Sequence, residues 1–195
     1  MKTETTTPKD KLFQTAARLF FQQGYRAVGV DMIAAESGIG KMTLYRHYPS
    51  KDDLIFAFLR ESDRDFWEYF EQSTQDAPGA REKLLAFFDA LQSYVTSPAC
   101  YGCPFINVAS EYPDPDYPGH QIAMEHKRSV RARFSQLARE AGARQPEALS
   151  NTLLLLMDGA YIAARMVGAS IENPAVSVAQ AAKQIIEVHC EVRTA

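Results

Sequence analysis

The sequence predicts an all-α protein with two unequal domains. Runs with an apolar β-branched side chain at every second position are missing, and apolar residues recur instead at intervals of three and four, the spacing of one helix face. Proline and glycine interrupt this pattern at several points, where they end helices. The length of 195 residues accommodates a small domain over 1–51 and a larger one over 52–195.

The N-terminal part is expected to form four helices, over 9–23, 31–36, 40–47 and 51–72. The first has an apolar stripe along one side and ends at Gly24, which permits a left-handed stop. Gly38 allows a sharp exit from the second helix, and Pro49 breaks the third. Ser50 is placed to cap the fourth, which is long enough to connect the two domains.

The larger domain is expected to contain five more helices, over 80–96, 104–111, 119–141, 146–168 and 174–193. Their separators are Pro98, the 113–119 loop, Gly142 and the Asn173-Pro174 pair. No internal repeat is found in the sequence. We therefore expect one continuous helical body after the connecting helix.

The composition predicts a cytoplasmic protein. Hydrophobic residues make up 46% and charged residues 23%, which are ordinary values for globular domains. No apolar run approaches the roughly 18 residues of a membrane-spanning helix, and the N-terminal stretch lacks the apolar segment of a secretory signal. The three cysteines are few and odd in number, which favours reduced thiols over a disulfide scaffold.

Charge is distributed unevenly along the chain. Through Lys51 there are eight Lys or Arg residues against four Asp or Glu residues, a balance of +4. The formal net charge of −3 leaves −7 for the remainder. A basic N-terminal domain suits an approach to DNA phosphates, whereas the acidic remainder is repelled by them.

The segment over 31–48 has the spacing of a helix-turn-helix. Four apolar residues can form the wedge between its crossed helices: Ile33, Ala34, Ile39 and Leu44. Gly38 can form the turn between them. The second helix would then be held outward, as a recognition helix requires.

A polar surface is expected on and beside this second helix. Its residues are Lys41, Met42, Thr43, Tyr45, Arg46, His47 and Lys51. They combine hydrogen-bond donors with one flexible apolar side chain, and such groups can reach base edges and phosphates in a major groove. Tyr45 and Lys51 suit phosphate oxygens. The alternative, a packed helical hairpin without a DNA role, leaves this surface unexplained.

The motif extends on both sides of that segment. Its elements are Gly24-Tyr25, Val30 to Ala34, Gly38-Ile39, Leu44 to Tyr48 and Ser50 to Leu54. Over residues 9–59 this pattern resembles the N-terminal domain of the tetracycline-repressor (TetR) family of transcriptional regulators. The resemblance implies a three-helix DNA-binding domain, a homodimer on a near-palindromic operator, and DNA contacts by the seven residues of the polar surface. Gly29 and Gly40 depart from the family's Ser or Thr caps and offer no side-chain acceptor.

Two apolar helices near the C-terminus are expected to form a homodimer interface. Its predicted residues are Leu149, Leu153, Leu156, Ala160, Ala164, Ala182, Ile185, Ile186 and His189. Small residues around Gly159 would let helices of two copies approach closely in a four-helix interface. The family resemblance implies dimerisation through the last two helices. The alternative is that these faces pack only inside one chain.

Aromatic and polar residues of the larger domain are candidates for an effector pocket. They are Phe66, Phe70, Phe87, Tyr94, Phe105, Asn107, Tyr112, Met157, Tyr161 and Arg165. Such a set suits a partly aromatic small molecule, and ordinary core packing is the alternative for each residue. The basic run from Lys127 to Arg133 is interpreted as a solvated helix face rather than a second nucleic-acid or lipid site.

Outside the DNA-binding segment, Cys100 and Cys103 are the main candidates for a chemically reactive site. Cys103 precedes the expected helix over 104–111, whose N-terminal dipole would lower the pKa of a thiol. A redox or electrophile sensor is one hypothesis, and a buried side chain at a tight turn is the other. With His120 and His126 the pair loosely imitates a zinc spacing, but the two histidines lie about 240° apart on a helix. We therefore expect no metal site.

These features predict a ligand-responsive transcriptional regulator of the repressor type. Its partners would be double-stranded operator DNA, a small-molecule inducer and a second copy of the chain. The inducer would release DNA by favouring a conformation in which the spacing of the two DNA-binding domains no longer fits the operator. No catalytic motif or cofactor-binding motif is found, so an enzyme is not expected. A helical protein-interaction module is the rival, and sequence-specific, salt-sensitive DNA binding would exclude it.

Overall fold

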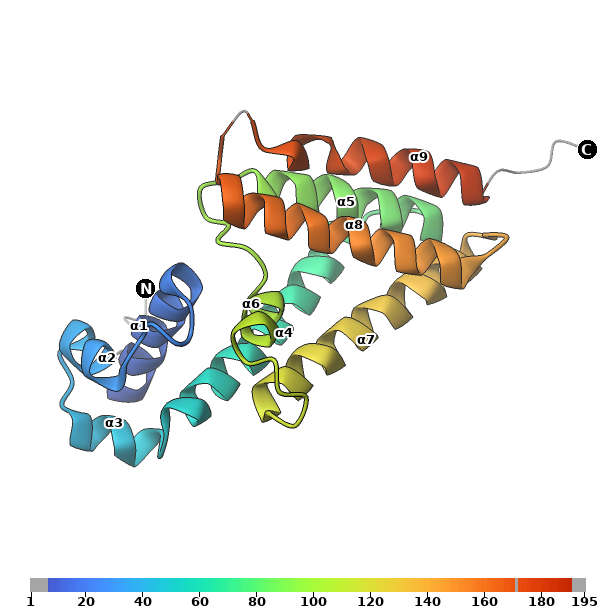
Figure 1. Ribbon diagram of the computed structural model, residues 1–195. Coiled ribbons are helices and arrows are strands. Elements are labelled where there is room, and N and C mark those ends of the chain that lie inside the picture. The colour runs from blue at the N-terminus through green and yellow to red at the C-terminus, as the bar shows by residue number, and fades with distance from the viewer. Residues whose placement is uncertain (1–6, 171, 191–195) are drawn as a thin grey trace, which may run out of the picture. The chain divides into compact units, whose positions relative to one another are not determined.

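The computed structural model describes residues 7–170 and 172–190, and every regular element in this part of the chain is helical (Figure 1). The elements are α1 Pro8–Gln23, α2 Val30–Ser37, α3 Lys41–His47, α4 Lys51–Thr74, α5 Ala80–Val95, α6 Pro104–Glu111, α7 Pro118–Glu140, α8 Pro146–Val167, the 3₁₀ helix η1 Pro174–Ser177 and α9 Val178–Cys190. The predicted all-α class is confirmed. None of these helices combines the length and hydropathy that crossing a bilayer requires.

Tertiary contacts divide the chain into two compact units. The N-terminal unit consists of Met1–Asp63 with Pro104–Ala123, and the C-terminal unit of Arg64–Cys103 with Met124–Ala195. This division differs from the expected boundary between residues 51 and 52, because α6 and parts of α4 and α7 belong with the first three helices. Sequence order could not show that grouping, since α6 lies about eighty residues after the turn that it contacts.

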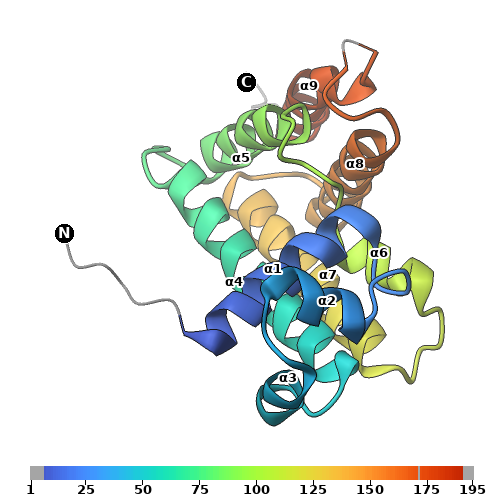
Figure 2. The ribbon, with the colours of Figure 1, turned by 90° about the vertical axis from the view of Figure 1, so that its left-hand side faces the viewer.

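The first three helices pack on one another in the N-terminal unit (Figure 2). A reciprocal capping box between Thr7 and Asp10 starts α1, and Gly24 ends it with φ +89°. The apolar stripe of α1 faces inward because it meets the buried residues of α2 and α3. The fully buried side chains of this core include Leu12, Ala16, Leu19, Phe20, Ile33 and Leu44. The stripe predicted from the helical period is therefore the core face.

In the C-terminal unit, α5, α8 and α9 pack side by side (Figure 1). The last helix begins later than the predicted residue 174, because Asn173 opens a 3₁₀ turn over η1 before α9. Its buried side chain accepts the backbone N–H of Ala175 at 2.9 Å and donates to the carbonyl of Gly168 at 2.9 Å. Residues 191–193 of the predicted helix lie outside the described residues.

Candidate nucleic-acid interface

A left-handed turn at Gly38 sets the angle between α2 and α3. Gly38 has φ +66°, and the N–H of the following Ile39 donates to the Ala34 carbonyl at 3.2 Å. Ile33 and Leu44 are completely buried between the helices. The predicted wedge therefore forms around these two side chains, and α3 is held with its other side free.

The outward side of α3 is both polar and apolar. Met42 is 86% exposed and Tyr45 is 47% exposed, and both Lys41 and Arg46 are exposed. Thr43 and His47 are half-buried at the flanks of this surface. An isolated chain gains nothing from leaving a methionine so open to water, because burial of apolar surface is favourable. The surface is therefore suited to an external partner.

Lys41 is held by a residue that the sequence pattern did not single out. Its ammonium forms an ion pair with the carboxylate of Asp31, in the first turn of α2. The hydrogen bond to Asp31 raises the pKa of Lys41. Both side chains are exposed, so the pair is accessible to a competing anion such as a DNA phosphate.

A capping box starts α4 directly after the recognition helix. The N–H of Asp53 donates to Ser50 Oγ at 3.1 Å, and the N–H of Ser50 donates to Asp53 Oδ2 at 2.9 Å. Lys51 is therefore the first residue of a rigid helix and is half-buried. Burial lowers the pKa of Lys51, and the carboxylates of Asp52 and Glu111 oppose this shift. The ammonium is presented at a defined place beside α3.

Glu111, the last residue of α6, anchors the turn that follows α1. One carboxylate oxygen accepts the N–H of Tyr25 at 3.0 Å, and the other accepts the N–H of Arg26 at 2.6 Å. At the other end of α6, the Pro104 carbonyl accepts the Tyr25 hydroxyl at 2.9 Å. The Arg26 guanidinium lies 5.0 Å above the ring of Tyr112. No local sequence signal marks Glu111, because its partners are about 85 residues away.

Comparison with known families accounts for both halves of the chain. Residues 12–58 match the model of "Bacterial regulatory proteins, tetR family". Residues 80–181, more than half of the chain, match the "Tetracyclin repressor-like, C-terminal domain". The chain belongs to the TetR family. It is therefore a DNA-binding transcriptional regulator and not an enzyme.

Individual relatives are similar to this chain in sequence or fold over most of its length. The crystal structure of a TetR-family transcriptional regulator from Streptomyces coelicolor superposes with a TM-score of 0.87 at 30% identity, covering 94% of this chain and 96% of that one. The HTH-type transcriptional regulator YjdC of Escherichia coli is 26% identical over 153 residues, which are 77% of this chain and 80% of YjdC. The regulator YxaF of Bacillus subtilis is 28% identical over 142 residues, 72% and 74% of the two chains.

Most of the face predicted for dimerisation lies inside the single chain. Six of the nine predicted interface residues are buried inside the single chain: Leu149, Leu153, Ala160, Ala164, Ala182 and Ile186. They lie in the core between α8, α9 and α5, and Ala160 also lines a groove between α8, η1 and α9. Leu156, Ile185 and His189 are half-buried. The apolar residues that α8 and α9 leave exposed are instead Leu155, Ile162, Met166, Val167 and Val188.

The candidates for an effector pocket fall into both units. Phe105, Asn107 and Tyr112 belong to the N-terminal unit, where Tyr112 stacks on Tyr117 at 4.4 Å. The other seven belong to the C-terminal unit. There the rings of Phe66, Phe70 and Phe87 lie within 6.5 Å of one another, and Tyr94 lies 6.2 Å from Tyr161. Arg165 is exposed.

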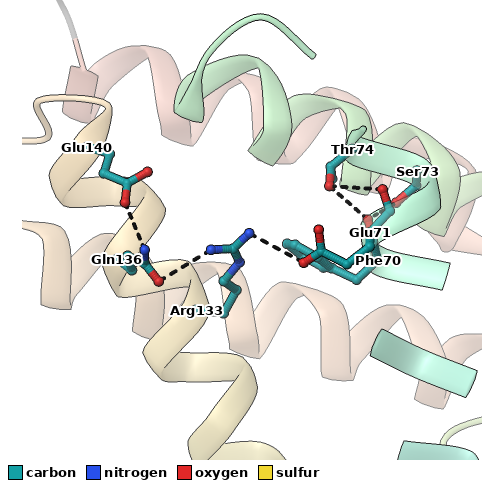
Figure 3. Close-up of polar contacts among 7 residues, drawn as sticks. All are labelled: Phe70, Glu71, Ser73, Thr74, Arg133, Gln136 and Glu140. Atoms are coloured by element: carbon teal, nitrogen blue, oxygen red, sulfur yellow. Dashed lines mark hydrogen bonds and ion pairs between the residues drawn. The ribbon is translucent and has the colours of Figure 1, made fainter. Parts of the chain in front are cut away.

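Phe70 is a core residue rather than an open pocket wall. It is fully buried, and the guanidinium of Arg133 lies 5.5 Å from its ring centre. Figure 3 shows how Arg133 is held there, by Glu71 on α4 at 3.4 Å and Gln136 on α7 at 3.3 Å. Arg133 therefore has a packing role within the basic run of α7. Phe87 and Met157 are also completely buried.

Both cysteines of the predicted thiol pair are buried. Cys100 is 6% exposed and Cys103 is 4% exposed. Burial raises the pKa of the Cys100 thiol, so the reactive thiolate is disfavoured at neutral pH. Cys103 does directly precede α6, as expected. These environments favour the interpretation as small buried side chains over a sensor of oxidants.

Proposed function

We propose that this TetR-family regulator is a ligand-responsive repressor that binds a palindromic operator as a homodimer and is released by a small-molecule inducer. The observation that carries the proposal is the exposed polar face of α3, which no other part of the described N-terminal unit covers. Lys41, Arg46 and Lys51 supply cations for phosphates or bases on that side of the chain. A repressor of this kind acts on chromosomal DNA, hence in the cytoplasm.

An exposed apolar row and a neighbouring groove support a homodimer. Leu155, Ile162 and Met166 form an exposed apolar row on α8, and Val188 is a further exposed apolar residue on α9. A groove of about 260 Å³ lies beside the row, between α8, η1 and α9, and it is lined mainly by apolar residues. A second copy fits this surface best, because a two-fold axis would bring identical apolar rows together.

Gly159 supports the close approach of that second copy. It lies within α8, and no atom lies within 4 Å of the place where its Cβ would stand. A glycine inside a helix costs about 0.5–1 kcal/mol relative to alanine. No contact among the described residues fills this space, whereas the backbone of a partner helix would use it.

The path of α4 supports a response to ligand. Its first half lies in the N-terminal unit and begins at Lys51, and its second half contributes Phe66 and Phe70 to the aromatic cluster of the C-terminal unit. An inducer that binds among the aromatic residues could bind one position of α4 more tightly than another. It would then shift the population toward that conformation and change the spacing of the two DNA-binding domains of the dimer. Half-sites would lie about one helical turn, roughly 34 Å, or a multiple apart.

Selection of bound sequences from random duplex DNA tests the DNA-binding part of the proposal. We expect wild-type protein to enrich a palindrome, and Arg46→Ala and Tyr45→Ala proteins to bind that palindrome too weakly to enrich it at the same salt and protein concentration, although their weaker binding remains measurable at higher concentration. Arg128→Ala is the matched control, because Arg128 is an exposed arginine on α7. Failure of the wild type to enrich any sequence at moderate salt would contradict the proposal and favour a protein-interaction module. The selected operator then serves to screen small molecules that release it.

Sedimentation analysis of two methionine variants tests the dimer. Met166 is 79% exposed on the proposed interface, and Met124 is 41% exposed on α7. We expect Met166→Glu to be folded and monomeric and Met124→Glu to remain dimeric, since a buried charge without a partner disrupts an apolar interface. A dimeric Met166→Glu protein would place the interface elsewhere.

A further inference from the structure

The direction of each side chain on α3 follows from the residues that are buried. Successive residues of an α-helix are turned by about 100° around its axis. Leu44 and Tyr48 are the buried residues of this segment and mark the direction of the core. Arg46 then lies about half a turn from that direction, at the middle of the outward face, and Met42 lies about 40° from Arg46.

Tyr45 and His47 occupy the two sides of this face. Each is the chain neighbour of Arg46 and lies about 100° from it, in opposite directions around the axis. When a helix lies in the major groove, its outermost side chains meet the base edges and its lateral side chains meet the phosphate walls. The exposures agree with this order, since Met42 is the most exposed of the large apolar side chains in the described part of the N-terminal unit.

We propose that Arg46 and Met42 read bases, Arg46 a guanine and Met42 the methyl group of a thymine, while Tyr45 and His47 contact phosphates on the two groove walls. This inference rests on the proposed function. A guanidinium can donate two hydrogen bonds to O6 and N7 of guanine. The thymine methyl is the apolar group on the major-groove edge of the bases, and it matches the open thioether chain of Met42.

The distance between Arg46 and Met42 along α3 predicts how far apart the two recognised bases lie in each half-site. Residues four apart are separated by about 6 Å along a helix, and consecutive bases of one strand by about 3.4 Å. Each half-site should therefore contain a thymine and a guanine about two base-pair steps apart. The order of the two bases gives the direction in which α3 lies in the groove.

Single-atom changes in the selected operator test the assignment. Deoxyuridine in place of each thymine removes only the methyl group, and 7-deazaguanine in place of each guanine removes only the N7 acceptor. We expect one thymine in each half-site at which deoxyuridine weakens wild-type binding about threefold or more, and one guanine at which 7-deazaguanine weakens it about fivefold or more. Met42→Ala protein should be insensitive to the first change and Arg46→Ala to the second.

Cross-combinations supply the control. Met42→Ala should keep the full 7-deazaguanine effect, and Arg46→Ala should keep the full deoxyuridine effect. Both residues are exposed, so thermal melting should show that both variants fold like the wild type. Equal sensitivity of wild type and variant to the same base change would overturn the assignment of that reader. Such a result would leave the palindrome in place, whereas absence of any selected palindrome would defeat the proposed function itself.

Discussion

The carboxylate of Glu111 accepts the backbone N–H of Tyr25 at 3.0 Å, although the two residues are 86 positions apart. The second carboxylate oxygen takes up the N–H of Arg26. Both N–H groups belong to the turn that follows the end of α1 at Gly24. One side chain of α6 thus fixes the turn that follows α1 in the N-terminal unit.

Removal of this carboxylate should destabilise the protein. Glu111→Ala removes the acceptor of two backbone N–H groups, of which that of Tyr25 is part-buried and that of Arg26 is exposed to water, so the free energy of unfolding should fall by about 1 kcal/mol. Urea denaturation measures the loss. Glu111→Gln, which keeps one acceptor oxygen, should lose less, and Glu125→Ala at an exposed site of α7 should lose almost nothing. Equal stability of Glu111→Ala and wild type would contradict the anchoring role.

Gly24→Ala should have a similar effect for a steric reason. Gly24 has φ +89°, a conformation that residues with a Cβ rarely adopt, and an added Cβ would stand 2.7 Å from Glu111 Oε1. The variant must strain the backbone or displace the carboxylate, so we expect a loss of about 1 kcal/mol or more. Gly40→Ala is the comparison, because Gly40 has φ −62° and open space around it. Thermal melting of the two variants distinguishes strain from a general intolerance of alanine.

Alkaline pH should destabilise the fold through the half-buried phenol of Tyr94 and the buried phenol and thiol of Tyr161 and Cys100. Burial raises the pKa of Tyr94 and Tyr161 above the ordinary 10.0 and that of Cys100 above 9.0. The unfolded chain therefore releases these protons first as pH rises. Stability should be fully present below about pH 9 and should decline above it, by up to about 1.4 kcal/mol per pH unit for each group.

Denaturation at pH values from about 7 to about 11 measures this decline. Tyr94→Phe removes one of the groups and should make the decline shallower, whereas Tyr45→Phe, at an exposed phenol of α3, serves as the control. A Tyr94→Phe protein whose stability falls as steeply as that of the wild type would show that the pKa of Tyr94 is the same in the folded and unfolded chain.

Asp31→Asn should strengthen DNA binding. The substitution releases Lys41 from its ion pair and removes a negative charge beside the recognition helix. At low salt we expect roughly a twofold to tenfold rise in operator affinity, and a log–log salt dependence steeper by about 0.9 for each further phosphate that the protein neutralises. Fluorescence anisotropy at several salt concentrations measures both. Asp76→Asn, in the exposed turn after α4, should leave affinity and slope unchanged.

The sequence alone was sufficient for the helix-turn-helix and for most helix ends. Ser50 caps α4 and Gly38 makes the left-handed turn as predicted, because caps and turns depend on a few neighbouring residues. The stripe of α1 was also predictable, since its opposite side is polar and leaves one choice for the buried face. The family pattern over 9–59 consists of these same local features.

Tertiary structure alone decided which faces of the C-terminal helices are open. Four consecutive leucines, 153 to 156, make α8 apolar almost all round, so the helical period cannot tell which side packs inward. Packing against α5 and α9 buries Leu153 and leaves Leu155 72% exposed. The contact of Glu111 with Tyr25 is of the same kind. The open face of α8 and the contact of Glu111 both depend on which surfaces meet in the folded chain. The residues next to them in the sequence do not determine contacts with residues that are far away along the chain.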